Sequence, residues 1–460
     1  MKTEAIAASY RDPSGFVFRR DGVLLRQVNA SFREHFDHFI SSGLYDRLVA
    51  ERLLVAHRDV DLASAATPDA YRVIAPDPVP FISYPYEWSF SQLKDAARVT
   101  LRVMREALQH GLILRDGTAY NIQFVGGQPV FIDTLSFGRH EPGTPWQGYR
   151  QFCEHFIAPL ALMARRDPAL GVLHRMSGDG IPLALASRLL DTTSYFRLGL
   201  LLHLHMHARM QRKYAGRRIE SRRKMPIESL RRLVDHLEMT VDSLDWQPDR
   251  TVWAQYEKEH NYTDRGFEAK RRIVGEMLQR IRPRTVWDLG ANTGIFSRMA
   301  AEQGAFVVSM DFDHGAVELN YRRLRSDESA RPKVLPLVMD LLNPSADGGF
   351  GSAERTSLVG RGPADAAIAL ALVHHLTLSG NVPFGRLAEF LARASEALII
   401  EFVPLEDPQA QRLIASRLEG FHQYDRAHFE DAFRQRFRIE ESQTVADSNR
   451  VLYRMTRLGT

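Results

Sequence analysis

The 460-residue sequence contains a single cysteine, Cys153. One cysteine excludes an internal disulfide, a cysteine-based zinc site and an iron–sulfur cluster held by several thiolates, together with the radical chemistry of such clusters. Long apolar runs are also lacking, since the best run, AAIALALV, is far shorter than the roughly 18 residues of a membrane-spanning helix. The opening residues, MKTEAIAASYRD, contain no apolar core typical of a secretory signal, so we expect a cytoplasmic protein with no membrane span.

A large excess of one charge is missing as well. The 60 Lys and Arg residues against 56 Asp and Glu leave a net charge of +4, and the composition of 44% hydrophobic and 25% charged residues is that of an ordinary globular chain. At roughly 150 residues per domain, several units are expected. The patterns predict an N-terminal α+β accessory domain over residues 1–210, a basic helical linker over 211–249 and an α/β domain of alternating strands and helices over 250–460.

Positive charge gathers in one segment, which contains a single acid, Glu220. A solvated linker or helix face is the simpler interpretation, and contact with an anion or a nucleic acid is the alternative. Only Tyr214 could stack on a base, so nucleic acid is not the expected partner. The cations of the segment are Arg212, Lys213, Arg217, Arg218, Arg222, Arg223 and Lys224.

The strongest motif lies in TVWDLGANTGIFSRMAAEQGAFVVSMDFD, residues 285–313. Its pattern predicts a short strand over 285–289, a glycine-containing turn over 290–294, a helix over 295–303 and a second strand over 305–310. Asp311 closes the second strand 23 positions after Asp288, the distance at which an acid can bind ribose hydroxyls. Asp313, two residues later, is the competing acid.

A nicotinamide-binding turn would show G-x-G-x-x-G, but this turn has Asn292 at the second glycine and Ser297 three positions beyond Gly294. With Asp288 before it, the turn instead resembles motif I of class I S-adenosylmethionine-dependent methyltransferases, in the D-x-G-A-N-x-G form of O-methyltransferases. The later segments VLPLVMDLLNPS, ADAAIALALVHHL and ALIIEFVP resemble that family in the same order. The resemblance implies a Rossmann-like seven-stranded sheet and an S-adenosylmethionine site made by Asp288, Gly290, Asn292, Gly294, Asp311, Asp340 and Leu341, the last two at the adenine.

His374 and His375 follow the predicted fourth strand, where the acceptor and the methyl group would meet in this family. A histidine could accept a proton during transfer, because its pKa is near neutrality. Adjacent residues point to opposite faces, so at most one of the two is expected to face the acceptor. Alignment of the reactants can supply much of the rate, so a base is not obligatory. No residue spacing predicts a metal site.

In the N-terminal part, Asp116 is followed five residues later by Asn121, and the strand VFID ends in Asp133. This spacing is similar to the catalytic loop and metal-binding segment of kinase-like folds. The glycine-rich phosphate loop and the usual strand lysine are missing, and Arg26 is the nearest basic candidate. The resemblance therefore implies an inactive kinase-like domain, and the alternative is an α+β domain in which these side chains make turn and capping hydrogen bonds.

The order of motifs resembles bacterial methyltransferase-like proteins that include a rhizobial nodulation protein. It implies methyl transfer to an oxygen, or a nitrogen, of a small molecule, glycan or lipo-oligosaccharide. Two alternatives stay open: a bifunctional kinase–methyltransferase that modifies one acceptor, and an RNA- or anion-binding protein with a methyltransferase-like fold. The sequence indicates no oligomeric state.

Overall fold

The computed structural model describes residues 3–213, 225–248, 262–415 and 423–459. They form two compact units, Met1–Gln247 with Asp347–Arg355 and Pro248–Ala346 with Thr356–Thr460. Within the described ranges, no helix has both the length and the apolar character needed to cross a bilayer.

A five-stranded antiparallel sheet in the order β1-β2-β3-β5-β4 opens the first unit. The turn Asp21-Gly22 joins β2 to β3, with φ of 48° and 84°, because a tight hairpin requires left-handed conformations at both positions. Two short pairs, β6 with β9 and β7 with β8, follow. The strands are β1 (Thr3–Ala5), β2 (Gly15–Arg20), β3 (Val23–Asn29), β4 (His57–Val60), β5 (Ala70–Pro76), β6 (Leu112–Leu114), β7 (Ile122–Val125), β8 (Gln128–Phe131) and β9 (Phe137–Arg139).

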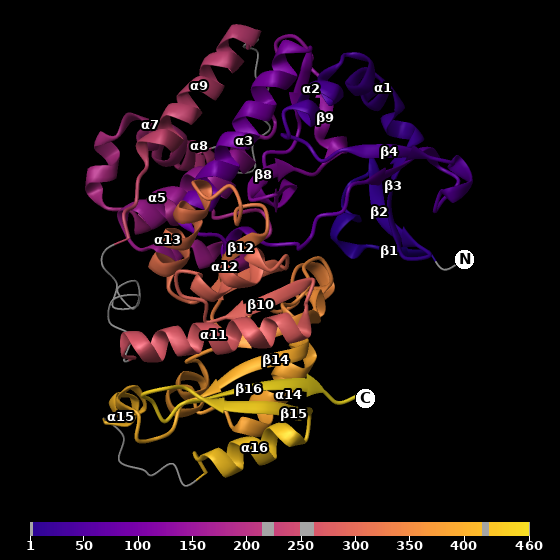
Figure 1. Ribbon diagram of the computed structural model, residues 1–460. Helices are drawn as coiled ribbons and strands as arrows, with labels where there is room; N and C mark the ends of the chain where they lie inside the picture. The colour runs from indigo at the N-terminus through magenta and orange to yellow at the C-terminus, as the bar shows by residue number, and fades with distance from the viewer. Residues whose placement is uncertain (1–2, 214–224, 249–261, 416–422, 460) are drawn as a thin grey trace. The chain divides into compact units, whose positions relative to one another are not determined.

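The described part of the first unit also contains helices (Figure 1). The residues of α9 fall in the predicted linker, yet α9 packs on α3, where Arg98 pairs with Asp242 at 2.7 Å and Arg105 with Glu238 at 2.5 Å. Residues 214–224, which hold most of the basic segment, lie outside the described residues. The helices are α1 (Arg33–Ser41), α2 (Leu44–Ala50), α3 (Phe90–Gln109), α4 (Tyr149–Phe152), α5 (Ala158–Arg165), α6 (Leu183–Leu189), α7 (Leu198–Leu200), α8 (His207–Lys213) and α9 (Ile227–Ser243), with π-helical segments η7 (Cys153–Ile157) and η10 (Leu201–Met206).

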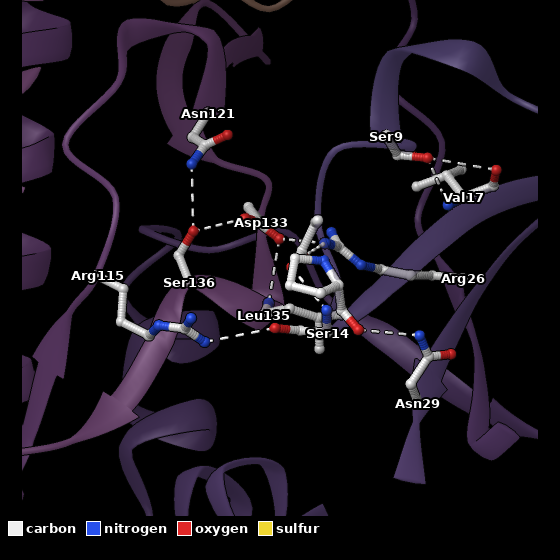
Figure 2. Close-up of polar contacts among 12 residues, drawn as sticks. Ser9, Ser14, Val17, Arg26, Asn29, Arg115, Asn121, Asp133, Leu135 and Ser136 are labelled. Carbon is white, nitrogen blue, oxygen red and sulfur yellow. Dashed lines mark hydrogen bonds and ion pairs between the residues drawn. The ribbon is translucent and has the colours of Figure 1, made fainter. Parts of the chain in front are cut away.

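A buried ion pair connects the N-terminal sheet to the turn after β8 (Figure 2). Arg26 on β3 pairs with Asp133 at 2.5 Å, and the side chains are 10% and 14% exposed. The Asp133 carboxylate also accepts the Leu135 backbone N–H at 3.1 Å and the Ser136 hydroxyl at 2.5 Å. Asn121 donates to the Ser136 hydroxyl at 3.2 Å. The structure therefore places Asp133 in the capping arrangement that the sequence left as an alternative.

The second unit is built on a seven-stranded sheet in the order β12-β11-β10-β13-β14-β16-β15. The pairs from β12 to β14 are parallel, and β16 and β15 are antiparallel. The expected mixed α/β architecture with a multi-stranded sheet is confirmed. The strands are β10 (Thr285–Leu289), β11 (Phe306–Asp311), β12 (Val334–Val338), β13 (Ala364–Ala369), β14 (Ser395–Phe402), β15 (Phe437–Thr444) and β16 (Val451–Arg457).

Side chains on both faces of this sheet are buried. Val286 and Val307 pack in one core cluster with α11 and α12, while their strand neighbours Trp287 and Val308, which point the other way, are also buried. A parallel sheet needs such cover on both faces. The helices are α11 (Asp264–Ile281), α12 (Ile295–Glu302), α13 (His314–Arg325), α14 (Phe384–Ala394), α15 (Pro408–Ile414) and α16 (Arg426–Arg434), with the π-helical segment η13 (His375–Ser379).

The strand order reverses at β10. The chain passes from β10 to β11 and β12 on one side and then returns to β13 on the other side of β10. The carboxyl ends of these parallel strands meet at one edge, because Leu289 pairs with both Met310 and Ala369, and Asp311 with Val338. Such a reversal leaves a crevice outside the strand ends, the usual place for a ligand in an open α/β sheet.

Replacing Arg26 with Met should destabilise the first unit by about 2 to 3 kcal/mol, because Asp133 would remain buried without its cation. Arg33→Met is the matched control: Arg33 and its partner Asp37 are 65% and 46% exposed, so less than about 1 kcal/mol is expected. Calorimetric unfolding of the full chain should show one transition lowered by the first substitution only. Equal shifts in both variants would contradict a structural role for the buried pair.

Candidate functional site

A cavity of about 370 Å³ lies at the carboxyl ends of β10, β11, β12 and β13. Its wall comes from the turn after β10, the segments after β11 and β12, the loop between β13 and η13, and the N-terminal part of α11. The lining residues used below are Tyr262, Lys270, Asp288, Gly290, Asn292, Asp311, Phe312, Met339, Asp340, Leu341, Leu342, Ala371, Leu372 and His375.

The turn after β10 contains residues with positive φ angles, a backbone conformation that few residue types adopt. Gly290 and Gly294 have φ of 75° and 78°, and Asn292 has φ of 51°. A Cβ on Gly294 would lie 2.5 Å from the amide nitrogen of Asn320, so the turn also needs glycine for close packing. Gly290 and Asn292 line the cavity, whereas Gly294 starts α12 behind it.

Asp288 is buried beneath this turn. Its carboxylate accepts the Ser297 hydroxyl at 2.6 Å, and Ser297 lies 2.8 Å from the Ser309 hydroxyl. Burial raises the pKa of Asp288 to about 7. Ser297 therefore holds the acid in position.

Asp311 rather than Asp313 faces the cavity. The Asp311 carboxylate accepts the backbone N–H of Asn292 at 2.7 Å on one oxygen and that of Asp313 at 2.9 Å on the other. Burial raises the pKa of Asp311 to about 6 despite these bonds. Asp313 is absent from the lining and caps α13, accepting the N–H of Gly315 at 2.7 Å and of Ala316 at 3.2 Å.

The segment after β12 adds an exposed acid and apolar side chains to the cavity wall. Asp340 accepts the backbone N–H of Leu342 at 2.9 Å, which closes a local turn. Leu341, Leu342 and Met339 line the cavity beside it. Phe312, from the segment after β11, is also part of the wall.

The two adjacent histidines are placed differently. His375 lines the cavity, while His374 is 1% exposed and is absent from the lining. Burial, with Arg450 nearby, lowers the pKa of His375 to about 4, and burial with His375 as neighbour lowers the pKa of His374 well below its usual value. Both rings are therefore neutral at pH 7.

A buried charge cluster supports the cavity wall. The carboxylate of Glu401 in β14 accepts hydrogen bonds from the Lys270 ammonium at 2.7 Å, from the Ala371 backbone N–H at 2.7 Å and from the Tyr262 hydroxyl. Arg450 lies 3.8 Å from Glu401. Burial alone would raise the pKa of Glu401, but Lys270 and Arg450 outweigh it and hold the pKa below its usual value.

The sequence motifs assign no role to Tyr262, Lys270 and Arg450, and none to Glu401 although it lies in the ALIIEFVP segment. The available signal was an acid inside an otherwise apolar strand, ALIIEFVP, because a charge in a buried strand requires a partner. Its partner Lys270 is 131 positions away, so local patterns do not reveal it.

Comparison with known proteins places the chain in a family. It is 34% identical to the nodulation protein NoeA of Rhizobium meliloti (strain 1021) over 461 residues, covering 98% of this chain and 96% of the relative. The chain belongs to the NoeA family. The resemblance to a rhizobial nodulation protein is thus confirmed, and no family model matches the chain.

Among solved structures, the chain is similar to three methyltransferases at low identity. The magnesium protoporphyrin IX methyltransferase of Synechocystis PCC 6803 with bound SAH matches with a TM-score of 0.34 and 15% identity, over 45% of this chain and 92% of that chain. The N-methyltransferase NodS of Bradyrhizobium japonicum WM9 gives 0.32 and 11%, over 43% and 98%. The bifunctional kinase-methyltransferase WbdD gives 0.31 and 17%, over 47% and 45%.

Glu401→Gln should destabilise the second unit of this NoeA-family chain by about 3 kcal/mol, because Lys270 would stay buried without a counter-charge. Glu268→Gln removes the same charge on α11, where Glu268 and its partner Arg271 are 68% and 45% exposed, so less than about 1 kcal/mol is expected. Hydrogen exchange of the α11 amides is the measurement. Unchanged protection in Glu401→Gln would contradict the supporting role of the cluster.

Proposed function

We propose that this NoeA-family chain is an S-adenosylmethionine-dependent methyltransferase whose second unit is a Rossmann-like methyltransferase domain. Its cavity binds the cofactor at the reversal of the strand order. When bound, S-adenosylmethionine supplies an electrophilic methyl carbon on its sulfonium sulfur. The acceptor provides the attacking oxygen or nitrogen.

The charge of the cavity carries this proposal. Three acids, Asp288, Asp311 and Asp340, line it, against one lysine, Lys270, whose ammonium already binds Glu401. S-adenosylmethionine bears a sulfonium, an ammonium and a carboxylate, for a net charge of about +1. A nicotinamide dinucleotide brings a pyrophosphate, which these carboxylates would repel. The cavity therefore favours the cationic cofactor.

Asp311 is suited to hold the ribose. Each carboxylate oxygen can accept two hydrogen bonds, and each already accepts one backbone N–H. Because Asp311 faces the cavity, its carboxylate can in addition accept a hydrogen bond from a ribose hydroxyl. The bonds from Asn292 and Asp313 fix the carboxylate in the orientation that this recognition needs.

The remaining wall fits the other parts of the cofactor. Leu341, Phe312 and Leu342 provide apolar surface for an adenine ring, and Asp340 can accept a hydrogen bond from the adenine amino group. At the methionine end of the cofactor, the Asp288 carboxylate can bind the cofactor's ammonium group. The Lys270 ammonium has three N–H donors and uses one for Glu401, so it can also donate to the cofactor's carboxylate.

His375 is the candidate base. Its neutral imidazole can accept a proton from an acceptor hydroxyl or amine, although its lowered pKa makes it a weak base. We propose an acceptor on a small molecule, glycan or lipo-oligosaccharide, with oxygen preferred over nitrogen. His374 acts only by supporting the loop.

The contacts of the first unit do not favour a second catalytic function. Asp133 already binds Arg26, a backbone N–H and a hydroxyl, and no group of three or more His, Cys, Asp or Glu side chains in the described ranges could hold a metal ion. Most cations of the 212–224 segment lie outside those ranges. We propose an accessory role for this unit.

Asp311→Ala should weaken S-adenosylmethionine binding at least about tenfold, because a hydrogen bond to a charged acceptor is lost. Asp313→Asn is the control: asparagine also caps helices, and Asp313 is outside the cavity, so affinity should not change. Calorimetric titration of S-adenosylmethionine and S-adenosylhomocysteine into each protein is the measurement. Absence of binding to the folded wild type would refute the cofactor assignment.

His375→Gln should lower kcat roughly 100-fold with unchanged cofactor affinity, if proton removal accompanies transfer. Because the neutral ring is the active form and its pKa is about 4, wild-type kcat at saturating cofactor should fall as the pH decreases toward that value. His374→Gln should alter thermal stability rather than kcat. The assay measures methyl transfer from labelled cofactor to free oligosaccharides and lipo-oligosaccharides. An unchanged kcat in His375→Gln would contradict a role as base and would attribute the rate to the alignment of acceptor and methyl group.

A further inference from the structure

The helical stretch of the first unit that runs from α7 through η10 to α8 has two opposite faces. Leu200, Leu204 and Ala208 are buried at four-residue spacing. Leu198, Leu202, Met206 and Met210, also four apart, are between 37% and 63% exposed, and Phe196 just before them is 89% exposed. The outward row is therefore apolar where a surface helix is normally polar.

The π-helical segment keeps this row together. In an α-helix, residues four apart advance slightly more than one turn, so a four-residue row drifts round the helix. A π-helix has a wider turn, with i→i+5 hydrogen bonds, and residues four apart advance less than one turn. Because η10 covers Leu201–Met206, in the middle of the row, it offsets the drift and leaves the four side chains nearer to one line.

The charged residues of the stretch itself, residues 192–213, have one sign. Arg197, Arg209, Arg212 and Lys213 are exposed, and residues 192–213 contain no Asp or Glu. Asp191, just before them, is held by Arg165 at 2.8 Å. No ion pair in the described residues includes Arg197, Arg209 or Arg212, whereas Arg98, Arg102 and Arg105 on α3 all pair with acids. The exposed Arg197 and Arg209, which take part in no ion pair among the described residues, thus stand directly next to the exposed Leu198 and Met210 in the chain.

We propose that this surface, Phe196–Lys213, docks the protein on an anionic lipid bilayer. An apolar row flanked by Arg and Lys is the composition of a helix that lies in the membrane interface, with its apolar side chains inserted and its cations at the lipid phosphates. Leucine, methionine and phenylalanine have no strong hydrogen-bonding groups and require no shape-matched partner. A second copy fits poorly, because a two-fold contact would bring the cations of both surfaces together.

The test is co-sedimentation of the full-length protein with vesicles of equal parts phosphatidylcholine and phosphatidylglycerol. Phe196→Ser/Met206→Ser/Met210→Ser should reduce the partition coefficient at least about tenfold, because three exposed apolar side chains no longer insert. Val23→Ser/Leu62→Ser/Met239→Ser removes three comparably exposed apolar side chains elsewhere in the first unit and should bind as the wild type does. Pure phosphatidylcholine vesicles should bind weakly, and salt should weaken binding to the anionic ones.

Three outcomes would overturn the proposal. The first is no binding of the wild type to anionic vesicles at low salt. The second is equal binding by the triple variant at 196, 206 and 210, which would assign the attraction to charge alone, including the cations of residues 217–224. The third is a changed oligomeric state of that variant in analytical ultracentrifugation without a changed partition, which would make the surface an interface between copies. None of these measurements depends on methyl transfer.

Discussion

The cavity of the second unit depends on one buried carboxylate. Glu401 lies in the central part of the sheet, where an unpaired charge would be prohibitively unfavourable, so its neighbours must supply cations and hydrogen-bond donors. They come from α11, from the loop after β13 and from the segment before β16. Because Tyr262, Lys270 and Ala371 are both partners of Glu401 and part of the cavity wall, satisfying this charge also shapes the binding site.

The turn after β10 adds the second constraint. Its left-handed Asn292 brings a backbone N–H to Asp311, and Asp288 is buried beneath the turn. Burial raises the pKa of both acids, so each is poised to gain from a cationic ligand that stabilises its ionised form. Acids concentrated in a cavity with apolar walls are better matched to a sulfonium cofactor than to a phosphate-rich one.

The first unit uses its charges differently. Arg26 and Asp133 neutralise each other inside the unit, and the arginines of α3 pair across to neighbouring helices. Along α7, η10 and α8, exposed cations and exposed apolar side chains occur together without acids in the same stretch. This contrast within one unit is what distinguishes that stretch from an ordinary solvated surface.

Much of the architecture follows from local sequence. The hairpin at Asp21-Gly22, the long helix α3 and the strand–turn–helix at residues 285–302 were predictable, because turn residues and apolar periodicity act between near neighbours. The apolar spacing of Phe32, Phe36 and Phe39 suits a helix, but this helix does not continue: Gly43, with φ of 78°, separates α1 from α2, and β4 begins at His57. That glycine was visible in the sequence but its conformation was not.

By itself, the sequence determined the acid-bearing glycine turn, the order of strands and helices that follows it, and the exclusion of cysteine-based chemistry. Only the tertiary structure decided that Asp311 rather than Asp313 faces the cavity, that His375 rather than His374 lines it, and that Lys270 and Glu401 support it. The reason is physical: local conformation depends on residues a few positions apart, whereas burial and charge pairing depend on segments that meet only after the chain has folded.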